Sequence, residues 1–400
     1  MDDRYSLEYR PATIRHGSGV VAALEDELDR RGRSRALVVT GSTVGSTPAV
    51  VDPVTAGIGG HLTGVFDEVG AGKRLGTACV AAEQVQAWNV DALVSLGGGS
   101  SLDAAKIVSV LAAHDDARAA AERMAEQKRI TVPNGPLTDI FAVPTTLPGA
   151  DLSQGAGVTL SMDTGDVPAS ERPSGGVSDP RLMPEAVFHD PALLAETPTD
   201  VLSRSAMNGF DKGVEMLYAR EHTPITDGTA IRGLRLLQGS LPELPDAPSE
   251  SALSAALRGI AATQYGVSTP RTYRASIIHS FGHALSQNYP IQQGVAHAIA
   301  APHVLTYLFE RVDGRRDLLA EAFDVDAEGP EAAAEAVVDA VADVRDGLEL
   351  PAQLRTVEDA EKTDFPQLAQ AVIDDSFMAA APAGLDADQA GIESVFAAMW

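Results

Sequence analysis

The spacing of apolar and polar positions changes near the middle of this chain. In the first half, short apolar runs at residues 36–40, 92–96, 139–143 and 186–189 predict buried strands. Stretches with helical spacing, such as residues 83–89, separate the strands. Strands joined by helices predict a parallel sheet, which binds its ligands at the carboxyl ends of the strands.

Helical spacing dominates beyond about residue 195. Helix starts are predicted at Thr197-Pro198-Thr199-Asp200, at Ser203 and at Thr223-Pro224. The acidic, alanine-rich tract at residues 326–346 predicts an exposed pair of helices. We therefore expect an all-α C-terminal helical domain.

Two domains are expected, because 400 residues with 44% hydrophobic content can bury more than one core. The boundaries that we predict are 1–195 for an α/β domain and 196–400 for the helical domain. Residues 151–179 are rich in Gly, Ser, Asp and Pro and predict loops and a hairpin within the first domain.

Composition narrows the cellular setting. No apolar run approaches the roughly 20 residues needed to span a bilayer, and the polar start Met1-Asp2-Asp3-Arg4 lacks the layout of a signal peptide. A cytoplasmic protein is expected. Cys79 is the single cysteine, which excludes an intrachain disulfide and a cysteine-based metal site.

The formal net charge of −26 argues against nucleic acid and anionic membranes as partners. Only five of the 30 basic residues are lysine. Because dense ions screen the repulsion between carboxylates, an acidic and lysine-poor chain predicts adaptation to high salt, that is, a halophilic protein.

A glycine-rich turn, Gly97-Gly98-Gly99-Ser100-Ser101, follows the predicted strand at residues 92–96 and precedes a predicted helix. Glycines let the backbone approach a ligand closely, and a helix N-terminus attracts an anion such as a pyrophosphate. The alternative is a tight turn that binds nothing. Thr145 and Thr146 end the next predicted strand and add hydroxyls that could contact a phosphate or a nicotinamide.

Several motifs, taken together in this order, resemble those of the iron-containing alcohol dehydrogenase superfamily. They are the triple-glycine turn with Ser100, Asp103 and Lys106, the Pro144-Thr145-Thr146 turn, the Asp190-Pro191 turn and the pair His279 and His283. The resemblance implies an N-terminal dinucleotide-binding domain, a Rossmann-like parallel sheet, that binds NAD(P), with catalysis and substrate binding in the helical domain. It also implies a homo-oligomer, such as a dimer, and a divalent metal held by one Asp and three His.

The chain departs from this resemblance at the metal ligands. Asn208 stands at the Asp position, Lys212 and Gln293 stand at two of the His positions, and only His279 is retained. One imidazole with two amides binds a divalent ion weakly, and Lys212 adds a positive charge. We therefore expect no bound metal. An alternative alignment makes Asp211 and Glu215 ligands of a shifted metal site.

The maleylacetate reductase branch resembles this chain most in its motifs. Its members share Asn208, the segment 214–219, and His297 followed by a Pro302-His303 segment. They work without a metal but usually keep a histidine where this chain has Lys212. The resemblance implies an NAD(P)-dependent oxidoreductase that interconverts a small alcohol and an aldehyde or ketone, or reduces an oxo-acid. The alternatives are a metal-dependent (Fe or Zn) alcohol dehydrogenase and an inactive homologue that binds nucleotide.

Hydride transfer to a carbonyl builds negative charge on oxygen, which a positive group must meet. We expect Lys212 to supply this charge, with His279 or His283 exchanging the proton. Lys212 could instead be an inert ion-pair partner of Asp211 or Glu215. Asn208, Gln293 and His297 are assigned to the substrate site or former metal site.

The end of the first predicted strand bears on the choice of cofactor. In NAD-preferring relatives an Asp at the position of Gly41 binds the ribose hydroxyls of the adenosine. Its absence removes repulsion of a 2′-phosphate, and Ser42 and Thr43 could donate hydrogen bonds to one. NADPH is therefore expected to be accepted alongside NADH.

Overall fold

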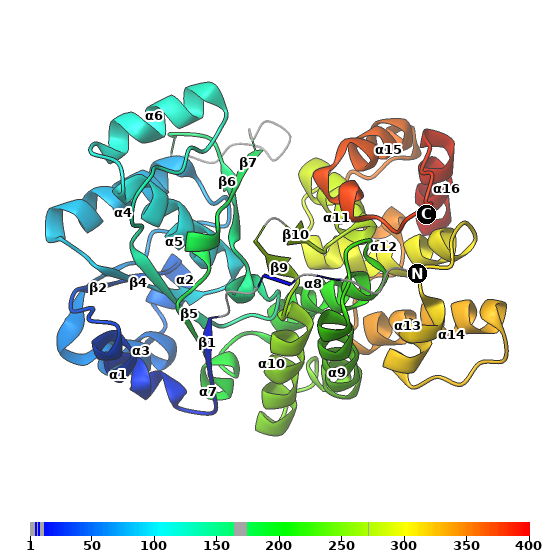
Figure 1. Ribbon diagram of the computed structural model, residues 1–400, viewed down its shortest axis with the longest axis horizontal. Helices are drawn as coiled ribbons and strands as arrows, with labels where there is room; N and C mark the ends of the chain where they lie inside the picture. Colours follow the sequence, from blue (N-terminus) through cyan, green and yellow to red (C-terminus); the bar gives the residue numbers. More distant parts are fainter. Residues whose placement is uncertain (1–4, 6, 9–11, 164–173, 271) are drawn as a thin grey trace. The chain divides into compact units, whose positions relative to one another are not determined.

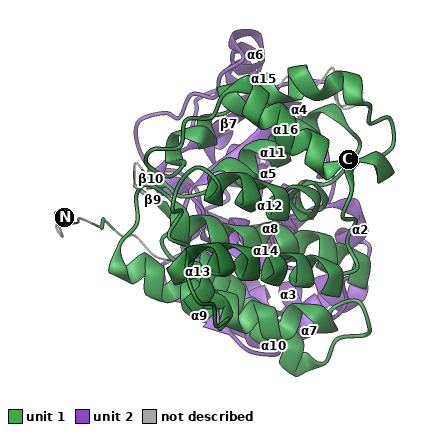
Figure 2. Ribbon diagram, turned by 90° about the vertical axis from the view of Figure 1, so that its right-hand side faces the viewer, with its two compact units in different colours: residues 1–8, 198–400 green, residues 9–197 purple. Residues whose placement is uncertain are grey.

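The computed structural model describes residues 5, 7–8, 12–163, 174–270 and 272–400. The chain divides into two compact units (Figure 2), one spanning Tyr9–Thr197 and the other Pro198–Trp400 together with Met1–Glu8. The division thus lies two residues beyond the expected boundary. The domain roles inferred from the sequence remain predictions.

The first unit is built on a parallel sheet (Figure 1). Among the described residues the sheet has six strands in the order β1-β8-β5-β4-β2-β3, and every neighbouring pair is parallel. Its strands are β1 (Thr13–His16), β2 (Ala36–Val39), β3 (Leu62–Phe66), β4 (Ala92–Gly97), β5 (Asp139–Pro144) and β8 (Ala186–His189). The four strands predicted from apolar runs are confirmed as β2, β4, β5 and β8.

Helices lie on both faces of this sheet. The apolar residues of α1 and α3 form one core cluster with β2, β4, β5 and β8, while α5 packs against β4 and β5. The helices of this unit are α1 (Leu24–Arg30), α2 (Ser42–Gly45), α3 (Pro48–Ile58), α4 (Leu75–Trp88), α5 (Gly99–Ala112), α6 (Ala117–Gln127) and α7 (Pro191–Leu194). The predicted helix at 83–89 is the second half of α4.

The hairpin expected within residues 151–179 is present. Strands β6 (Gly155–Thr159) and β7 (Ser174–Ser178) pair antiparallel. The residues that join them lie outside the described part of the chain. The parallel sheet with helices on both faces confirms the α/β class of this unit.

The second unit is almost entirely helical. Its helices are α8 (Thr199–Tyr218), α9 (Pro224–Ser240), α10 (Glu250–Gln264), α11 (Ile277–Asn288), α12 (Gln293–Phe309), α13 (Arg316–Phe323), α14 (Pro330–Gly347), α15 (Phe365–Asp374) and α16 (Gln389–Met399). Helix α8 contacts α9, α10 and α12, and it is buried from Ala206 to Tyr218. Among the described residues no helix is both long and apolar enough to cross a membrane.

Some expectations for this unit were wrong. Ser203 does not start a helix, because α8 begins at Thr199 and runs through it. The tract at residues 326–346 forms one helix, α14, rather than a pair. A two-residue hairpin, β9 (Ser268–Thr269) with β10 (Thr272–Tyr273), interrupts the helices. Thr223 does cap α9, through a reciprocal pair of bonds with Thr226.

Candidate active site

The glycine-rich turn connects β4 to α5 in the first unit. Gly97 has a φ of +130°, and Gly98 precedes the first helical residue without a side-chain cap from any described residue. Gly97 pairs with Pro144 on β5, and the N–H of Thr145 donates to the Gly97 carbonyl at 3.0 Å. The glycine turn and the Pro-Thr-Thr turn therefore lie side by side at the carboxyl ends of two neighbouring strands.

A pocket opens at this place. A Cβ at Gly98 would lie 3.0 Å from Thr146 Oγ1, so any side chain there would occupy the pocket. The N-terminus of a long helix and the Thr146 hydroxyl offer hydrogen-bond donors, which fit a pyrophosphate. The pocket is lined by Ser95, Gly97, Gly98, Gly99, Leu102, Ala142, Pro144, Thr146, Pro148, Ala150 and Asp151.

The other residues proposed to bind the cofactor do not line this pocket. Ser100 and Ser101 lie in the first turn of α5, and Asp103 accepts a 2.8 Å bond from Lys73 Nζ. Thr145 is buried, and its carbonyl accepts from Thr197 Oγ1 at 2.7 Å.

Gly41, Ser42 and Thr43 follow β2, the neighbour of β4 on the other side from β5. A Cβ at Gly41 would lie 2.9 Å from the Val69 carbonyl oxygen, so the position has no room for a side chain. This chain therefore lacks the carboxylate expected at this position in NAD-preferring relatives, and the backbone around Gly41 leaves no space for one.

Two buried charged groups beside the pocket support the loop that follows β5. Lys106 Nζ donates to the carbonyls of Ser153 at 2.6 Å and Gly155 at 2.8 Å. Asp151 Oδ2 lies 2.6 Å from His189 Nε2, and both side chains are buried. Lys106 therefore fixes the loop. Sequence reasoning missed the pairing of Asp151 with His189, because no local motif connects the two positions.

The second unit contains a buried cluster of four titratable side chains, Asp211 and Glu215 on α8, His279 on α11 and His297 on α12. His279 Nδ1 bonds to Glu215 Oε2, and the His279 N–H donates to Glu215 Oε1 at 3.1 Å. His297 Nδ1 lies 3.0 Å from Asp211 Oδ2. The two imidazole rings meet edge to face, with centroids 4.4 Å apart.

Burial drives this cluster toward its neutral forms. It raises the pKa of Asp211 well above its usual range and the pKa of Glu215 to about 7. It also lowers the pKa of His279 well below normal and the pKa of His297 to about 3. Losing hydration penalises each charged form, and of these four described side chains only Glu215 and His279 recover part of the lost hydration through hydrogen bonds to each other.

Lys212 lies on α8 between the two acids and is only 5% exposed. Burial lowers the pKa of His279 most, the His297 imidazole lowers it next, and the positive charge of Lys212 lowers it further. Lys212 also lowers the pKa of His297. A buried ammonium therefore stands close to both histidines. The structure brings Lys212, His279 and His297 together, while their roles in catalysis and substrate binding stay predictions.

The remaining positions of the former metal site are adjacent to this cluster. Asn208 lies one turn before Lys212 on α8 and is buried. A Cβ at Gly294 would overlap the Arg204 carbonyl and lie 3.6 Å from the Asn208 N–H nitrogen. The start of α12, with Gln293 next to Gly294, thus packs against α8 beside Asn208.

The donor set does not fit a divalent ion. Asn208, Lys212 and Gln293 supply two amides and a cation, and a divalent ion needs anionic or imidazole donors to replace its hydration. The carboxyl groups of the shifted pair, Asp211 and Glu215, contact the imidazoles of His297 and His279 directly. Within the part of the chain that the structure describes, no group of three or more His, Cys, Asp or Glu side chains is arranged to hold a metal ion.

His283 has a different environment from His279. Its side chain is 32% exposed, and its Nδ1 lies 2.8 Å from Asp375 Oδ2, just after α15. The Phe377 ring packs against His283 with centroids 4.8 Å apart and against His279 with centroids 5.6 Å apart. Sequence reasoning found neither Asp375 nor Phe377, since both lie more than 90 residues from His283 and carry no motif.

Comparison with known proteins places these features in a family. The family described as "Iron-containing alcohol dehydrogenase" matches residues 11–191, and its C-terminal counterpart, "Fe-containing alcohol dehydrogenase family, C-terminal", matches residues 203–400. Together the two matches cover nearly the whole chain.

Curated relatives and solved structures agree with this match. Lactaldehyde reductase of Escherichia coli (strain K12) is 28% identical over 368 residues, covering 90% of this chain and 91% of its own. Maleylacetate reductase 1 of Cupriavidus pinatubonensis is 23% identical, covering 80% and 83%. Sulfoacetaldehyde reductase of Bifidobacterium kashiwanohense, solved in complex with NAD+, shares the fold with a TM-score of 0.82 at 17% identity, covering 100% and 99%.

Proposed function

Because this chain belongs to the iron-containing alcohol dehydrogenase family, a family of oxidoreductases, we propose that it reduces a small aldehyde, ketone or oxo-acid with NAD(P)H. We further propose that it does so without a catalytic metal, with Lys212 as the positive group. The lactaldehyde and maleylacetate reductases among its relatives support a small carbonyl substrate.

The observation that carries this proposal is the position of Lys212. The motif resemblance assigns Lys212 to a ligand position of the family's metal site, and its side chain is buried next to His279 and His297. A fixed positive charge beside two buried histidines can stabilise an oxygen that gains negative charge during reduction, without solvent rearrangement.

The cofactor proposal depends on the glycine turn. Gly97, Gly98 and Gly99, with the start of α5 and Thr146, would hold the pyrophosphate. The bound nicotinamide supplies a hydride in reduction and accepts one in oxidation. The solved complex of a relative in fold with NAD+ supports this class of cofactor.

Replacing Lys212 tests the role of the ammonium. We expect Lys212→Met to lower kcat on the order of a hundredfold or more with the best carbonyl substrate, since an oxyanion donor is lost. Lys212→Arg should retain part of the activity. Lys128→Met, at an exposed position, is the matched control and should match the wild type. Wild-type turnover in Lys212→Met would contradict the proposed role.

Metal analysis tests the second part of the proposal. Protein purified without chelator should contain far less than one Fe or Zn per chain, and incubation with EDTA should leave turnover unchanged. About one tightly bound metal per chain, with activity lost on its removal, would show that the enzyme depends on a metal.

Cofactor choice can be measured directly by fluorescence titration with NADH and NADPH. Gly41 offers no carboxylate to repel a 2′-phosphate, although Asp67, after β3, packs against Gly45 and leaves one carboxylate in this region. We expect both cofactors to bind. Binding of NADH without measurable binding of NADPH would contradict this expectation.

A further inference from the structure

We propose that Asp375 is the positioning residue of His283: it fixes the imidazole so that Nδ1 faces the carboxylate and Nε2 exchanges the proton with the substrate oxygen. This inference rests on the proposed reductase activity. It also assigns the proton exchange to His283 and not to His279, a choice that the sequence left open.

The Asp375 carboxylate is held in place independently of His283. Its Oδ1 accepts the Phe377 N–H at 2.8 Å, as the cap of the short helix Ser376–Ala380, and the Ser280 hydroxyl at 3.5 Å. Its other oxygen, Oδ2, lies 2.8 Å from His283 Nδ1. A carboxylate anchored on one oxygen can orient an imidazole with the other, because the backbone fixes its rotation.

Asp375 also has the charge that this role requires. Burial raises its pKa, but the hydrogen bonds from His283 and from the Phe377 N–H outweigh burial and leave the pKa below its ordinary value. The group is therefore ionised at neutral pH. An anion beside Nδ1 keeps a proton on that nitrogen and stabilises the imidazolium that forms when Nε2 is also protonated.

His279 is unsuited to proton exchange with solvent. Its side chain is 3% exposed, its Nδ1 is bonded to Glu215, and burial keeps its pKa well below normal. Its Nε2 has no hydrogen-bond partner among the described residues. A proton given up by His279 could not readily be replaced from water, whereas solvent can reprotonate the half-buried His283.

The proton balance follows from this geometry. In reduction, the carbonyl carbon of the substrate gains the hydride, the π pair of the C=O bond moves to oxygen, and that oxygen takes the proton from His283 Nε2. His283 is left neutral, with its remaining proton on Nδ1 toward Asp375. Water then returns a proton to Nε2, and the alcohol and the oxidised nicotinamide leave.

The test is the pair of variants Asp375→Asn and Asp374→Asn. Asn removes the anion and can hold the wrong tautomer, so Asp375→Asn should lower kcat on the order of 10²–10⁴-fold. KM for the carbonyl and the Kd of the reduced cofactor should stay within about twofold. Asp374 is exposed and bonded to Gln370 at 3.0 Å, so Asp374→Asn is the matched control and should leave kcat, KM and Kd unchanged. Asp375→Glu should recover part of kcat.

The pH profile separates orientation from general structural support. His283 interacts with Asp375, with His279 on its own helix and with His297 on α12, and Lys212 on α8 acts on the same two histidines. Only Asp375 changes in the variant. A change in the pH profile of kcat that appears in Asp375→Asn and not in Asp374→Asn therefore reports on the contact with His283.

The outcomes distinguish this inference from the proposed function. If His283→Gln loses activity while Asp375→Asn behaves like Asp374→Asn, or loses kcat with the pH profile of the wild type, the positioning role is wrong and the reductase stands. If the wild type reduces no carbonyl with either cofactor, the proposed function fails and the inference fails with it. Thermal unfolding of each variant shows whether a loss of kcat reflects loss of fold.

Discussion

Burial in the fold favours the protonated form of the Asp211 carboxyl group. This group is completely buried 3.0 Å from His297, and burial raises its pKa well above the usual range, with the nearby Glu215 raising it further. A protonated carboxyl and an asparagine amide are both uncharged, have nearly the same size and shape, and each offers one acceptor oxygen and a donor. Asp211→Asn is therefore a nearly isosteric replacement of the form that the folded protein contains.

The sign of the pH dependence follows from this raised pKa. Above the unfolded pKa of about 4, the unfolded chain has lost the proton while the folded chain keeps it, so the wild type loses stability as pH rises. Relative to Asp211→Asn, its free energy of unfolding should fall by up to about 1.4 kcal/mol per pH unit until the folded pKa is reached.

Urea unfolding at pH 5, 6, 7 and 8 measures this difference, and Asp343→Asn, at an exposed position on α14, serves as the control. A constant gap between the wild type and Asp211→Asn at all four pH values would mean that Asp211 is ionised in the folded protein.

Individual site residues could be found in the sequence only where a local motif carried them. The glycines 97–99 and Thr146 belong to turns, and their meeting in one pocket follows from the pairing of β4 with β5. Lys212 stood out because it replaced an expected ligand. Asp151 and Asp375 act on histidines far along the chain, so only the tertiary fold makes their role visible.

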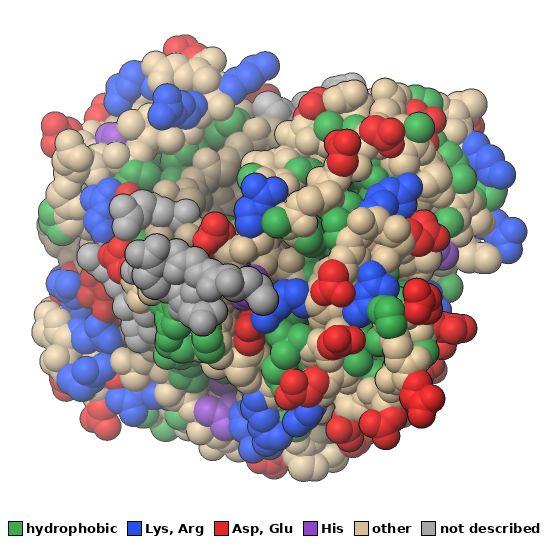
Figure 3. Space-filling view, turned by 45° about the vertical axis from the view of Figure 1, so that its right-hand side comes forward, with side chains coloured by type: hydrophobic (Ala, Val, Ile, Leu, Met, Phe, Trp, Pro, Cys, Tyr) green, Lys and Arg blue, Asp and Glu red, His purple; other side chains and the backbone are tan. Residues whose placement is uncertain are grey.

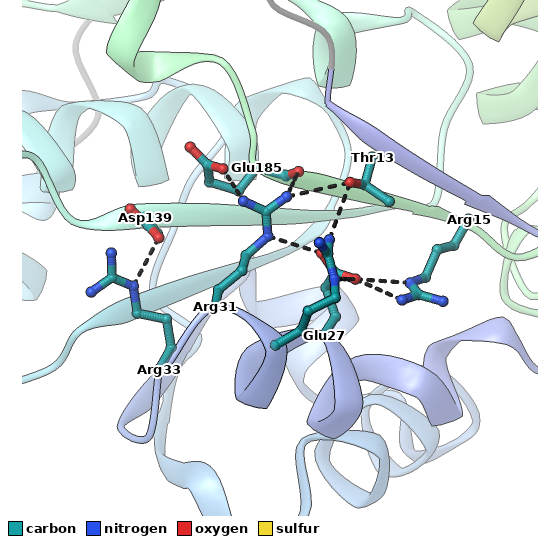
Figure 4. A network of polar contacts seen from close by, with 8 residues as sticks. Thr13, Arg15, Glu27, Arg31, Arg33, Asp139 and Glu185 are labelled. Carbon is teal, nitrogen blue, oxygen red and sulfur yellow. Dashed lines mark hydrogen bonds and ion pairs between the residues drawn. The ribbon is translucent and has the colours of Figure 1, made fainter.

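Helix α1 is anchored to the edge of the sheet by a buried acid, Glu27, which three arginines surround (Figure 4). Glu27 Oε2 accepts from Arg15 on β1 at 2.6 Å, and Oε1 accepts from Arg31 at 2.9 Å and also bonds to Arg30. Arg31 continues to the Glu185 carbonyl just before β8, at 2.7 Å. The network therefore connects α1 with both strands at this edge.

Removing the charge of Glu27 should loosen this edge. Burial raises its pKa, but bonds from Arg30, Arg15 and Arg31 outweigh burial and lower it to about 2. The stabilisation is complete above about pH 4.5 and is lost as pH falls through about 2. At pH 7 Glu27→Gln should cost about 2 kcal/mol, which allows for the solvent exposure of the arginines.

Chemical denaturation at pH 7 and at pH 3 checks this expectation against Asp26→Asn, an exposed neighbour on α1. The gap between Glu27→Gln and the wild type should shrink at the lower pH. An equal gap at both values would show that packing, and not charge, is what Glu27 contributes.

Elements were predictable from the sequence in proportion to their burial. Strands β2, β4 and β8 are buried at every position, and β5 at all but its first residue, so each is marked by a continuous apolar run. Strands β1 and β3 lie at the two edges of the sheet, are partly exposed and include polar residues or glycine, so no such run marks them. Polar side chains such as Arg15 hold β1 in place, and a search for apolar runs cannot detect such polar contacts.

At the scale of the whole molecule, acidic side chains gather in clusters on the surface. On the face drawn in Figure 3, Asp and Glu side chains gather at the lower right. Helix α14 has an exposed acidic stripe formed by Glu331, Glu335, Asp339, Asp343 and Asp346. Like charges four residues apart on a helix repel each other by about 0.2–0.5 kcal/mol per pair at low salt.

The double variant Glu335→Gln with Asp339→Asn removes three such pairs from this stripe. In dilute buffer it should therefore be about 1 kcal/mol more stable than the wild type. In 1 M KCl the Debye length falls to about 3 Å, so the advantage should vanish while the wild type itself gains stability. Glu126→Gln with Glu358→Gln removes the same charge from scattered exposed positions and should gain less in dilute buffer. Urea unfolding across a KCl series measures these free energies of unfolding. If the wild type is equally stable in dilute buffer and in molar KCl, its acidic surface is not an adaptation to salt, even if the α14 variant behaves as expected.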